Sequence, residues 1–259
     1  MKFFLRHFLP VTYFQSTRLN RWALVGYNAL VEWFPALALS FFYNNYDLSI
    51  IPVVVLSYLG FICIYEIGYI TNDFFSERFE TEPRGRAKNL PASSAWVGAI
   101  IGTRIVFFFA FTYLLGAVDS VLWCVFYGTL ATTFALHNVL PSAWRIPTFF
   151  GLSTYRYFAP IIIALSPAVL TVLIPALILN NSLYRTTVYL RNKNGDPGDM
   201  SGDMGFKLLF YVSCLPFSVM LAVFFDSPLP VVVCIYFLSI WVLFWAATWL
   251  FKIDKKVWR

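Results

Sequence analysis

Charge is scarce in this sequence. Asp, Glu, Lys and Arg make up 12% of its 259 residues, whereas hydrophobic residues make up 59% and aromatic residues 20%. A soluble domain carries about twice that share of charge. The composition therefore excludes an ordinary soluble protein and predicts a single membrane-embedded domain over residues 1–259. Within it, residues 1–20 carry scattered bases and are expected to form an N-terminal arm at the membrane interface.

The sequence also lacks the patterns of several common functional sites. Four cysteines, Cys63, Cys124, Cys214 and Cys234, lie in apolar segments without a metal-type pair, which predicts buried free thiols and argues against disulfides or zinc. There is no glycine-rich phosphate loop. The net charge of +6 comes from bases at the ends of apolar segments, where they set membrane topology, so we expect no nucleic acid partner.

Apolar runs long enough to cross a bilayer, about 20 residues each, recur along the chain. Because lipid offers no partner for unpaired backbone groups, these runs must be helical. The sequence therefore predicts an all-α, polytopic membrane helix bundle with about eight transmembrane helices around a central cavity. The predicted spans are 22–43, 48–71, 93–116, 119–139, 147–165, 168–190, 206–225 and 229–251.

Lys and Arg alternate between the two sides of this predicted bundle. They occur in the N-terminal arm, after the second, fourth and sixth spans, and at the C-terminus. The intervening connections, around Asp47, Asp119, Ser166 and Asp226, carry none. Since basic residues are retained in the cytoplasm, we expect both termini and the connections after the second and sixth spans to be cytoplasmic.

Two groups of acidic residues lie in those two cytoplasmic connections. The residues of the first group follow one another at steps of three or four, which would place their side chains on one helix face. They are Glu66, Tyr69, Asp73, Glu77 and Glu80. The second comprises Asp196, Asp199 and Asp203. Oxygen clusters of this kind suit Mg²⁺, with phosphate oxygens completing its shell, although a single cluster is as readily a solvated acidic loop. Two clusters on one side of a bundle can share metal ions and hold a diphosphate.

These two groups resemble the signatures of the UbiA-type intramembrane prenyltransferases. The family's first signature reads N-D-x-x-D-x-x-x-D; here Asn72-Asp73 is present, Ser76 replaces the next acid and Glu80 the last. The second, D-x-x-D-x-x-x-D, is intact as Asp196, Asp199 and Asp203. Members usually have nine helices, one more than predicted here.

The resemblance implies a UbiA-like bundle whose signatures bind Mg²⁺ and the diphosphate of a polyprenyl donor. It gives Asp73, Asp199 and Asp203 the catalytic role. The implied metal ligands are Asp73, Glu77, Glu80, Asp196, Asp199 and Asp203, with Glu77 standing in for the acid missing at Ser76. Candidate substrate-binding residues are Asn72, Arg84, Arg86, Arg156, Arg185, Tyr189, Asn192 and Lys193.

Three arginines, Arg104, Arg156 and Arg185, lie within apolar segments, where an unpaired charge costs several kcal/mol. On the sixth span, Arg185 belongs to a polar stripe leading toward Asp196, which favours a phosphate-binding role. Each arginine has a structural ion pair as its alternative, and Glu66 is the candidate partner of Arg104. His137 is either an acceptor-positioning residue or a hydrogen-bonded structural one.

The sequence thus predicts a magnesium-dependent membrane transferase that moves a prenyl group from a polyprenyl diphosphate to a small-molecule acceptor. One alternative is phosphoribosyl transfer from phosphoribosyl diphosphate to a polyprenyl phosphate, which fits the surplus intramembrane arginines. Another, prompted by Ser76, is a non-catalytic lipid-binding or transport relative.

Overall fold

The computed structural model describes residues 8–18, 22–76, 93–141, 144–193 and 204–250. Its longer elements are α-helices, five of which continue into or out of a short π-helix. In chain order they are α2 (Thr12–Arg18), α3 (Trp22–Asn28), η1 (Ala29–Trp33), α4 (Phe34–Tyr43), α5 (Ile50–Thr71), η2 (Asn72–Ser76), α6 (Ser94–Leu114), α7 (Val121–Val139), α8 (Arg145–Phe158), α9 (Pro167–Leu177), η5 (Ile178–Ser182), α10 (Leu183–Lys193), α11 (Met204–Phe224) and α12 (Leu229–Leu250).

Six helical segments are long and apolar enough to cross a membrane. They are Leu24–Tyr43, Ile50–Phe75, Ser94–Leu114, Pro167–Arg191, Met204–Phe224 and Leu229–Ala247. Each coincides with a span expected from the sequence, so the helical membrane bundle is confirmed. All four cysteines are free, as predicted, although Cys124 is exposed whereas the other three are buried.

The other two expected spans coincide with α7 and with α8. The helix α8 has 14 residues, which at 1.5 Å per residue is about 21 Å, less than the hydrocarbon thickness of a bilayer. It ends before Pro160, which has no N–H to continue the helical ladder. The turn that follows is almost entirely buried, and Asn44 Nδ2 donates to the carbonyl of Ala164 at 2.9 Å. Non-helical backbone is tolerated at this depth because protein covers it.

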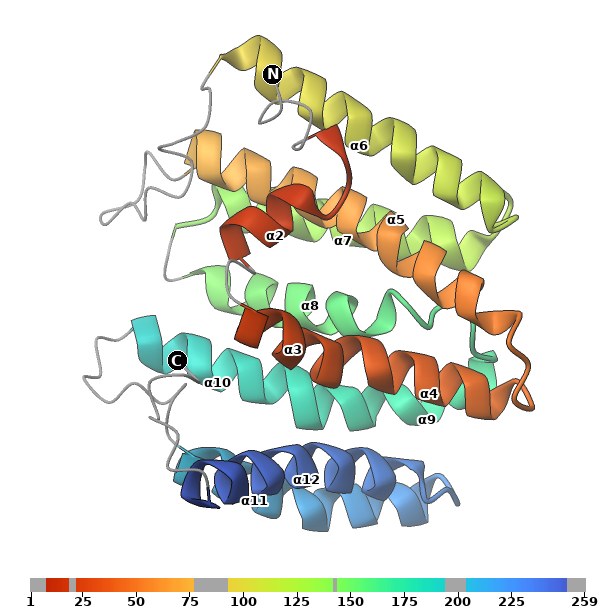
Figure 1. Ribbon diagram of the computed structural model, residues 1–259, viewed down its shortest axis with the longest axis vertical. Helices are drawn as coiled ribbons and strands as arrows, with labels where there is room; N and C mark the ends of the chain where they lie inside the picture. Colours follow the sequence, from red (N-terminus) through yellow and green to blue (C-terminus); the bar gives the residue numbers. More distant parts are fainter. Residues whose placement is uncertain (1–7, 19–21, 77–92, 142–143, 194–203, 251–259) are drawn as a thin grey trace.

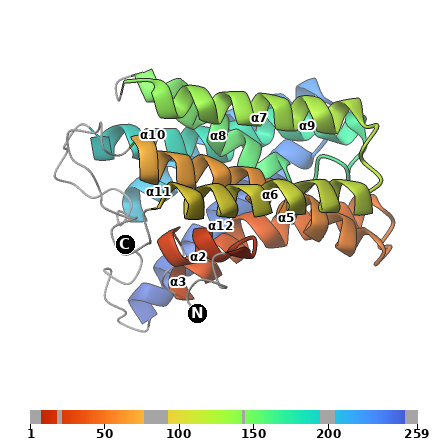
Figure 2. The ribbon, with the colours of Figure 1, turned by 90° about the horizontal axis from the view of Figure 1, so that it is seen from above.

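Most of the long helices run side by side along a common direction (Figures 1 and 2). The helix α5 packs against α6, α7 and α4, and α8 packs against α7 and α10. At the opposite side of the bundle, α12 packs against α11 and α9. Along the long axis of the bundle, α6 lies at one end and α11 with α12 at the other, and α8 lies between α5 and α10 (Figure 1).

Two helix ends, one within the first acidic group and one before the second, lie at the same end of the bundle. The π-helix η2 and the end of α10 are both on the left in Figure 1. The connections 44–49, 115–120 and 225–228, which carry no Lys or Arg, lie together at the right.

Close packing of α5 on α7 depends on Gly68, one residue before Tyr69 in the acidic segment. A Cβ added at Gly68 would overlap the ring of Phe134, whereas one added at Gly102 of α6 would meet nothing within 4 Å. We expect Gly68→Ala to lower the free energy of unfolding by about 1–3 kcal/mol through overpacking. The control Gly102→Ala should be neutral or stabilising, since Ala is the better helix former. Thermal unfolding of both variants in detergent tests this; equal melting temperatures would contradict the packing described here.

Candidate functional site

The N-terminal arm contributes α2, which covers the end of α5. Tyr13 and Phe14 are fully buried there. The hydroxyl of Tyr13 donates to Asp73 Oδ2 at 2.8 Å, and Arg18 Nη2 donates to both carboxylate oxygens of Asp73 at 2.9 and 3.0 Å. Burial, reinforced by the charge of Asp73, raises the pKa of Tyr13, so its phenol remains a hydrogen-bond donor. This part of the arm thus lies against the bundle, where it closes over Asp73.

Glu66 lies two helical turns before Asp73 on the same face of α5. The backbone N–H of Phe14 donates to Glu66 Oε1 at 2.7 Å, and Arg104 Nε of α6 donates to Oε2 at 2.8 Å. The side chains of Glu66 and Arg104 are both 0% exposed. Between the two acids, Tyr69 lies beneath Arg18, whose guanidinium carbon is 4.3 Å from the ring centroid. The spacing therefore predicted correctly that Glu66, Tyr69 and Asp73 share a face, and Arg104 has the structural partner that the sequence offered it.

A second charged cluster lies deeper in the bundle, around Glu32 of η1. Arg156 Nε of α8 is 2.6 Å from Glu32 Oε1, and Arg156 also donates to Asn28. Arg185 Nη1 of α10 lies 3.4 Å from the same oxygen and 3.4 Å from the hydroxyl of Tyr157. Sequence reasoning missed Glu32, although a lone acid within the first apolar run was a usable signal.

Aromatic rings separate the two clusters. Phe14 stacks on Tyr69 with centroids 6.1 Å apart. The guanidinium carbon of Arg156 lies 5.1 Å from the centroid of the Phe14 ring and 6.0 Å from that of Tyr65. The order from the end of α5 inward is therefore Asp73 with Arg18, then the rings, then Arg156 with Glu32.

The three π-helices within the described ranges all carry buried polar residues. Glu32 lies in η1, Asp73 in η2, and three consecutive buried residues, Asn180, Asn181 and Ser182, in η5. A π-helical turn widens the helix locally and changes which face a side chain presents, and such turns are frequent at functional sites. They are among the elements that helical periodicity alone does not predict.

Several predicted site residues lie outside the described residues: Glu77, Glu80, Arg84, Arg86, Asp196, Asp199 and Asp203. Asn192 and Lys193 belong to α10, but their side chains are not described. Of the others, Asn72 Nδ2 is 3.4 Å from Asp73 Oδ1, and Tyr189 stacks on Phe149 with centroids 4.1 Å apart. The ring Nδ1 of His137 lies 2.8 Å from the hydroxyl of Thr148.

Among the described residues, none joins Asp73 to form a magnesium site. In the described part of the chain, no three His, Cys, Asp or Glu side chains are grouped to hold a metal ion. Both oxygens of Asp73 contact the Arg18 guanidinium, a cation that a metal at the same carboxylate would repel. The magnesium site predicted from the sequence thus depends on residues outside the described ranges.

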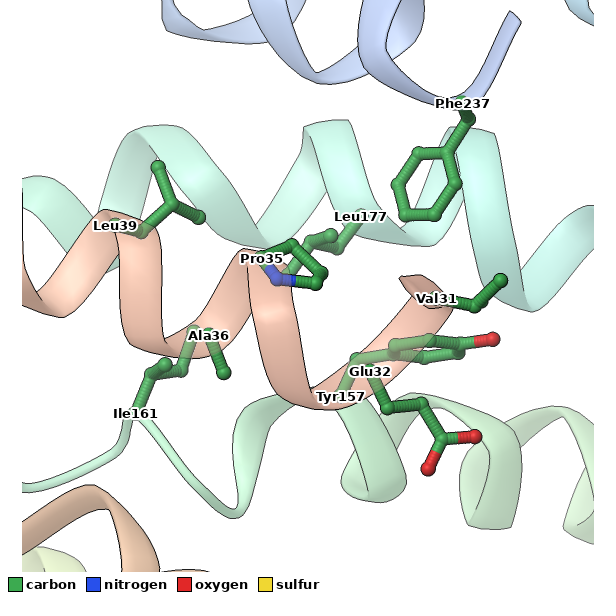
Figure 3. Close-up of a pocket in the computed structure, with 9 residues that line it drawn as sticks. All are labelled: Val31, Glu32, Pro35, Ala36, Leu39, Tyr157, Ile161, Leu177 and Phe237. Atoms are coloured by element: carbon green, nitrogen blue, oxygen red, sulfur yellow. The ribbon is translucent and has the colours of Figure 1, made fainter. Parts of the chain in front are cut away.

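A small apolar pocket of about 20 Å³, room for about one water molecule, adjoins the Glu32 cluster. Pro35, Ala36 and Leu39 of the first span form one wall, with Leu177 and Phe237 opposite (Figure 3). Tyr157 and Glu32 lie at one end of this pocket and Leu39 and Ile161 at the other (Figure 3). Its lining is mostly apolar, and its polar end lies beside the arginines that contact Glu32.

Comparison of the chain with protein-family models, with curated proteins and with solved structures finds no match.

Proposed function

We propose that this protein is a magnesium-dependent membrane transferase, similar to the UbiA-type enzymes, that moves a prenyl group from a polyprenyl diphosphate to an acceptor. The observation that supports it most is the position of the helix ends at the two acidic groups. The elements η2 and α10 end together at one end of the bundle, on either side of α8 (Figure 1). We propose that Asp73 in η2 and the acids that follow these two elements in the sequence act on one substrate.

The proposed roles follow from the chemistry of a departing diphosphate. Asp73, Asp199 and Asp203 are the essential carboxylates, with Glu77, Glu80 and Asp196 as further ligands. Bound Mg²⁺ would neutralise the charge that grows on the diphosphate as its carbon–oxygen bond breaks. Tyr65 and Tyr69 precede Asp73 on α5 and are the rings proposed to stabilise an allylic cation, which at Tyr69 requires Arg18 to move off the ring.

We further propose eight spans, the six apolar helices together with α7 and α8, and cytoplasmic termini. The connections without Lys or Arg lie together at one end, as the positive-inside rule requires of the external side. We expect Asn45→Cys, in a variant whose four native cysteines are Ala, to react with a membrane-impermeant thiol reagent from outside the cell. Asn89→Cys should react only after permeabilisation. Equal labelling of the two, or the reverse order, would contradict this topology.

One observation favours phosphoribosyl transfer to a polyprenyl phosphate as a second candidate. Arg156 and Arg185 share one carboxylate, that of Glu32. The rings of Phe14 and Tyr69 lie between this group and Asp73. An enzyme with two anionic substrates needs two places for phosphate, and surplus arginines supply the second. The third candidate, a non-catalytic relative, is favoured by the contacts of Asp73 with Arg18 and Tyr13.

Product analysis separates these candidates. Purified protein with Mg²⁺ is incubated with a polyprenyl diphosphate or with phosphoribosyl diphosphate plus a polyprenyl phosphate, and lipid products are identified by mass spectrometry. We expect the prenyl diphosphate to be consumed. Consumption of phosphoribosyl diphosphate alone would transfer the assignment to the second candidate, and consumption of neither would favour the third.

A further inference from the structure

The helix α2 covers a carboxylate that the proposed function needs at a substrate. It lies in front of α5 in Figure 1 and at the margin of the bundle in Figure 2. Beneath it, the side chain of Asp73 is only 1% exposed, and both carboxylate oxygens accept hydrogen bonds from Arg18. Tyr13 of the same helix donates to one of them. A ligand can therefore reach Asp73 only after α2 has moved away.

The attachment of α2 combines two buried rings with several polar contacts. The helix has seven residues, of which only Tyr13 and Phe14 are buried. A helix this short is not stable by itself in water. It therefore depends on its contacts with α5, chiefly the hydrogen bonds that Asp73 and Glu66 accept from it. Segments with few buried apolar side chains are those that open locally while the rest of a protein stays folded.

The backbone just before α2 is strained. Val11 has a φ of 76°, in the left-handed region that β-branched residues avoid. Such a conformation persists only where the surrounding contacts fix it. Phe8, before Val11, and Tyr13, after it, pack into the same small apolar cluster. Val11 itself packs against the main core. Docking of this segment therefore maintains the strain, and release would relax it.

We propose that α2 is an autoinhibitory latch, which shields Asp73 in its docked position and lifts from α5 while the rest of the bundle stays folded. Its main fastening is the Arg18–Asp73 ion pair, in which both partners of the hydrogen bonds are charged. The strain at Val11 favours release. That release permits catalysis rests on the proposed function, whereas the movement itself does not.

The test measures how fast a thiol beneath α2 reacts. Ile70 of α5 is 0% exposed and packs with Tyr13. Ile70→Cys is introduced into a variant whose four native cysteines are Ala, and its reaction with a water-soluble maleimide is followed in detergent. We expect Arg18→Gln to speed this reaction about tenfold or more, because loss of a charge-assisted hydrogen bond shifts the docking equilibrium by such a factor. An unchanged rate would overturn the latch.

A matched control separates release of α2 from loosening of the whole bundle. Ile62 also belongs to α5 and is 1% exposed, but it lies in the main core and not in the cluster beneath α2. The slow reaction of Ile62→Cys should therefore not change with Arg18→Gln. An equal rise at both positions would show that the bundle opens as a whole, and would overturn the proposal.

A pair of variants at Val11 tests the role of strain. Both Val11→Ala and Val11→Gly remove the valine methyl groups, but only glycine adopts a positive φ without steric cost. We expect Ile70→Cys to react about threefold more slowly with Val11→Gly than with Val11→Ala, since the docked state is then less strained. A rate with glycine that equals or exceeds the rate with alanine would show that strain does not drive release.

Turnover measured on the same variants distinguishes the latch from the proposed function. If α2 inhibits, Arg18→Gln should convert a subsaturating diphosphate donor faster than the unaltered protein does, and a slower conversion would overturn the inhibitory role. Faster labelling of Ile70→Cys without turnover in any variant would keep the latch and overturn the proposed function. Turnover with unchanged labelling would overturn the latch alone.

Discussion

Asp73→Asn is expected to lower magnesium-dependent turnover by about a hundredfold or more. Under the proposed function, the carboxylate holds a metal ion that stabilises the departing diphosphate, and an amide oxygen is a far weaker ligand. The same substitution also removes the acceptor of Arg18 and Tyr13. Turnover in the variant could therefore fall because the metal is lost or because α2 detaches from α5.

The matched control is Arg18→Gln. It removes the Arg18–Asp73 ion pair, whose atoms lie 2.9 Å apart, but keeps the carboxylate. We expect this variant to retain turnover within about tenfold of the unaltered protein, and to reach half-maximal rate at a lower Mg²⁺ concentration because a competing cation has gone. Both variants are assayed across a Mg²⁺ titration. Equal losses of turnover would mean that Asp73 anchors the arm and holds no metal.

Glu66→Gln should lower the free energy of unfolding by about 3–5 kcal/mol, because it leaves Arg104 buried without its charge partner. Both side chains are 0% exposed, so water cannot compensate. The amide oxygen of Gln can still accept from the Phe14 N–H, which Glu66 Oε1 accepts at 2.7 Å in the structure. The loss therefore reports on the ion pair and not on the docking of α2.

The double variant Glu66→Gln with Arg104→Met should recover most of that stability, since no charge then remains buried. Unfolding of the single and double variants in mixed micelles gives the coupling between the two positions. A Glu66→Gln variant within about 1 kcal/mol of the unaltered protein would show that the pair is not a major stabilising contact.

Helical periodicity was enough to place Glu66, Tyr69 and Asp73 on one face, because residues three or four apart in a helix are neighbours on its surface. The assignment to membrane proteins followed from composition, which likewise requires no knowledge of tertiary contacts. The partners of these acids could not be predicted like this. Tyr13 lies 60 positions from Asp73, and nothing in the pattern of either segment specifies that contact.

The interior cluster shows the same limit. Arg156 and Arg185 were recognised because charge is rare in apolar segments, but Glu32, 153 positions before Arg185, was needed to explain them. The end of α8 has a local signal in Pro160, but the turn after it is stable in a membrane only because the packed bundle buries it. Local spacing thus predicted which residues share a helix face, and tertiary packing decided which ones meet.

Release of inorganic diphosphate tests the central claim most directly, because both transfer reactions release it whatever the acceptor. Purified protein is supplied with each diphosphate donor and its acceptor, with Mg²⁺ or with EDTA, and diphosphate is measured over time. We expect release from one donor that requires Mg²⁺ and falls to background in Asp73→Asn. Absence of release from both donors, or release that persists in EDTA, would contradict a magnesium-dependent transferase.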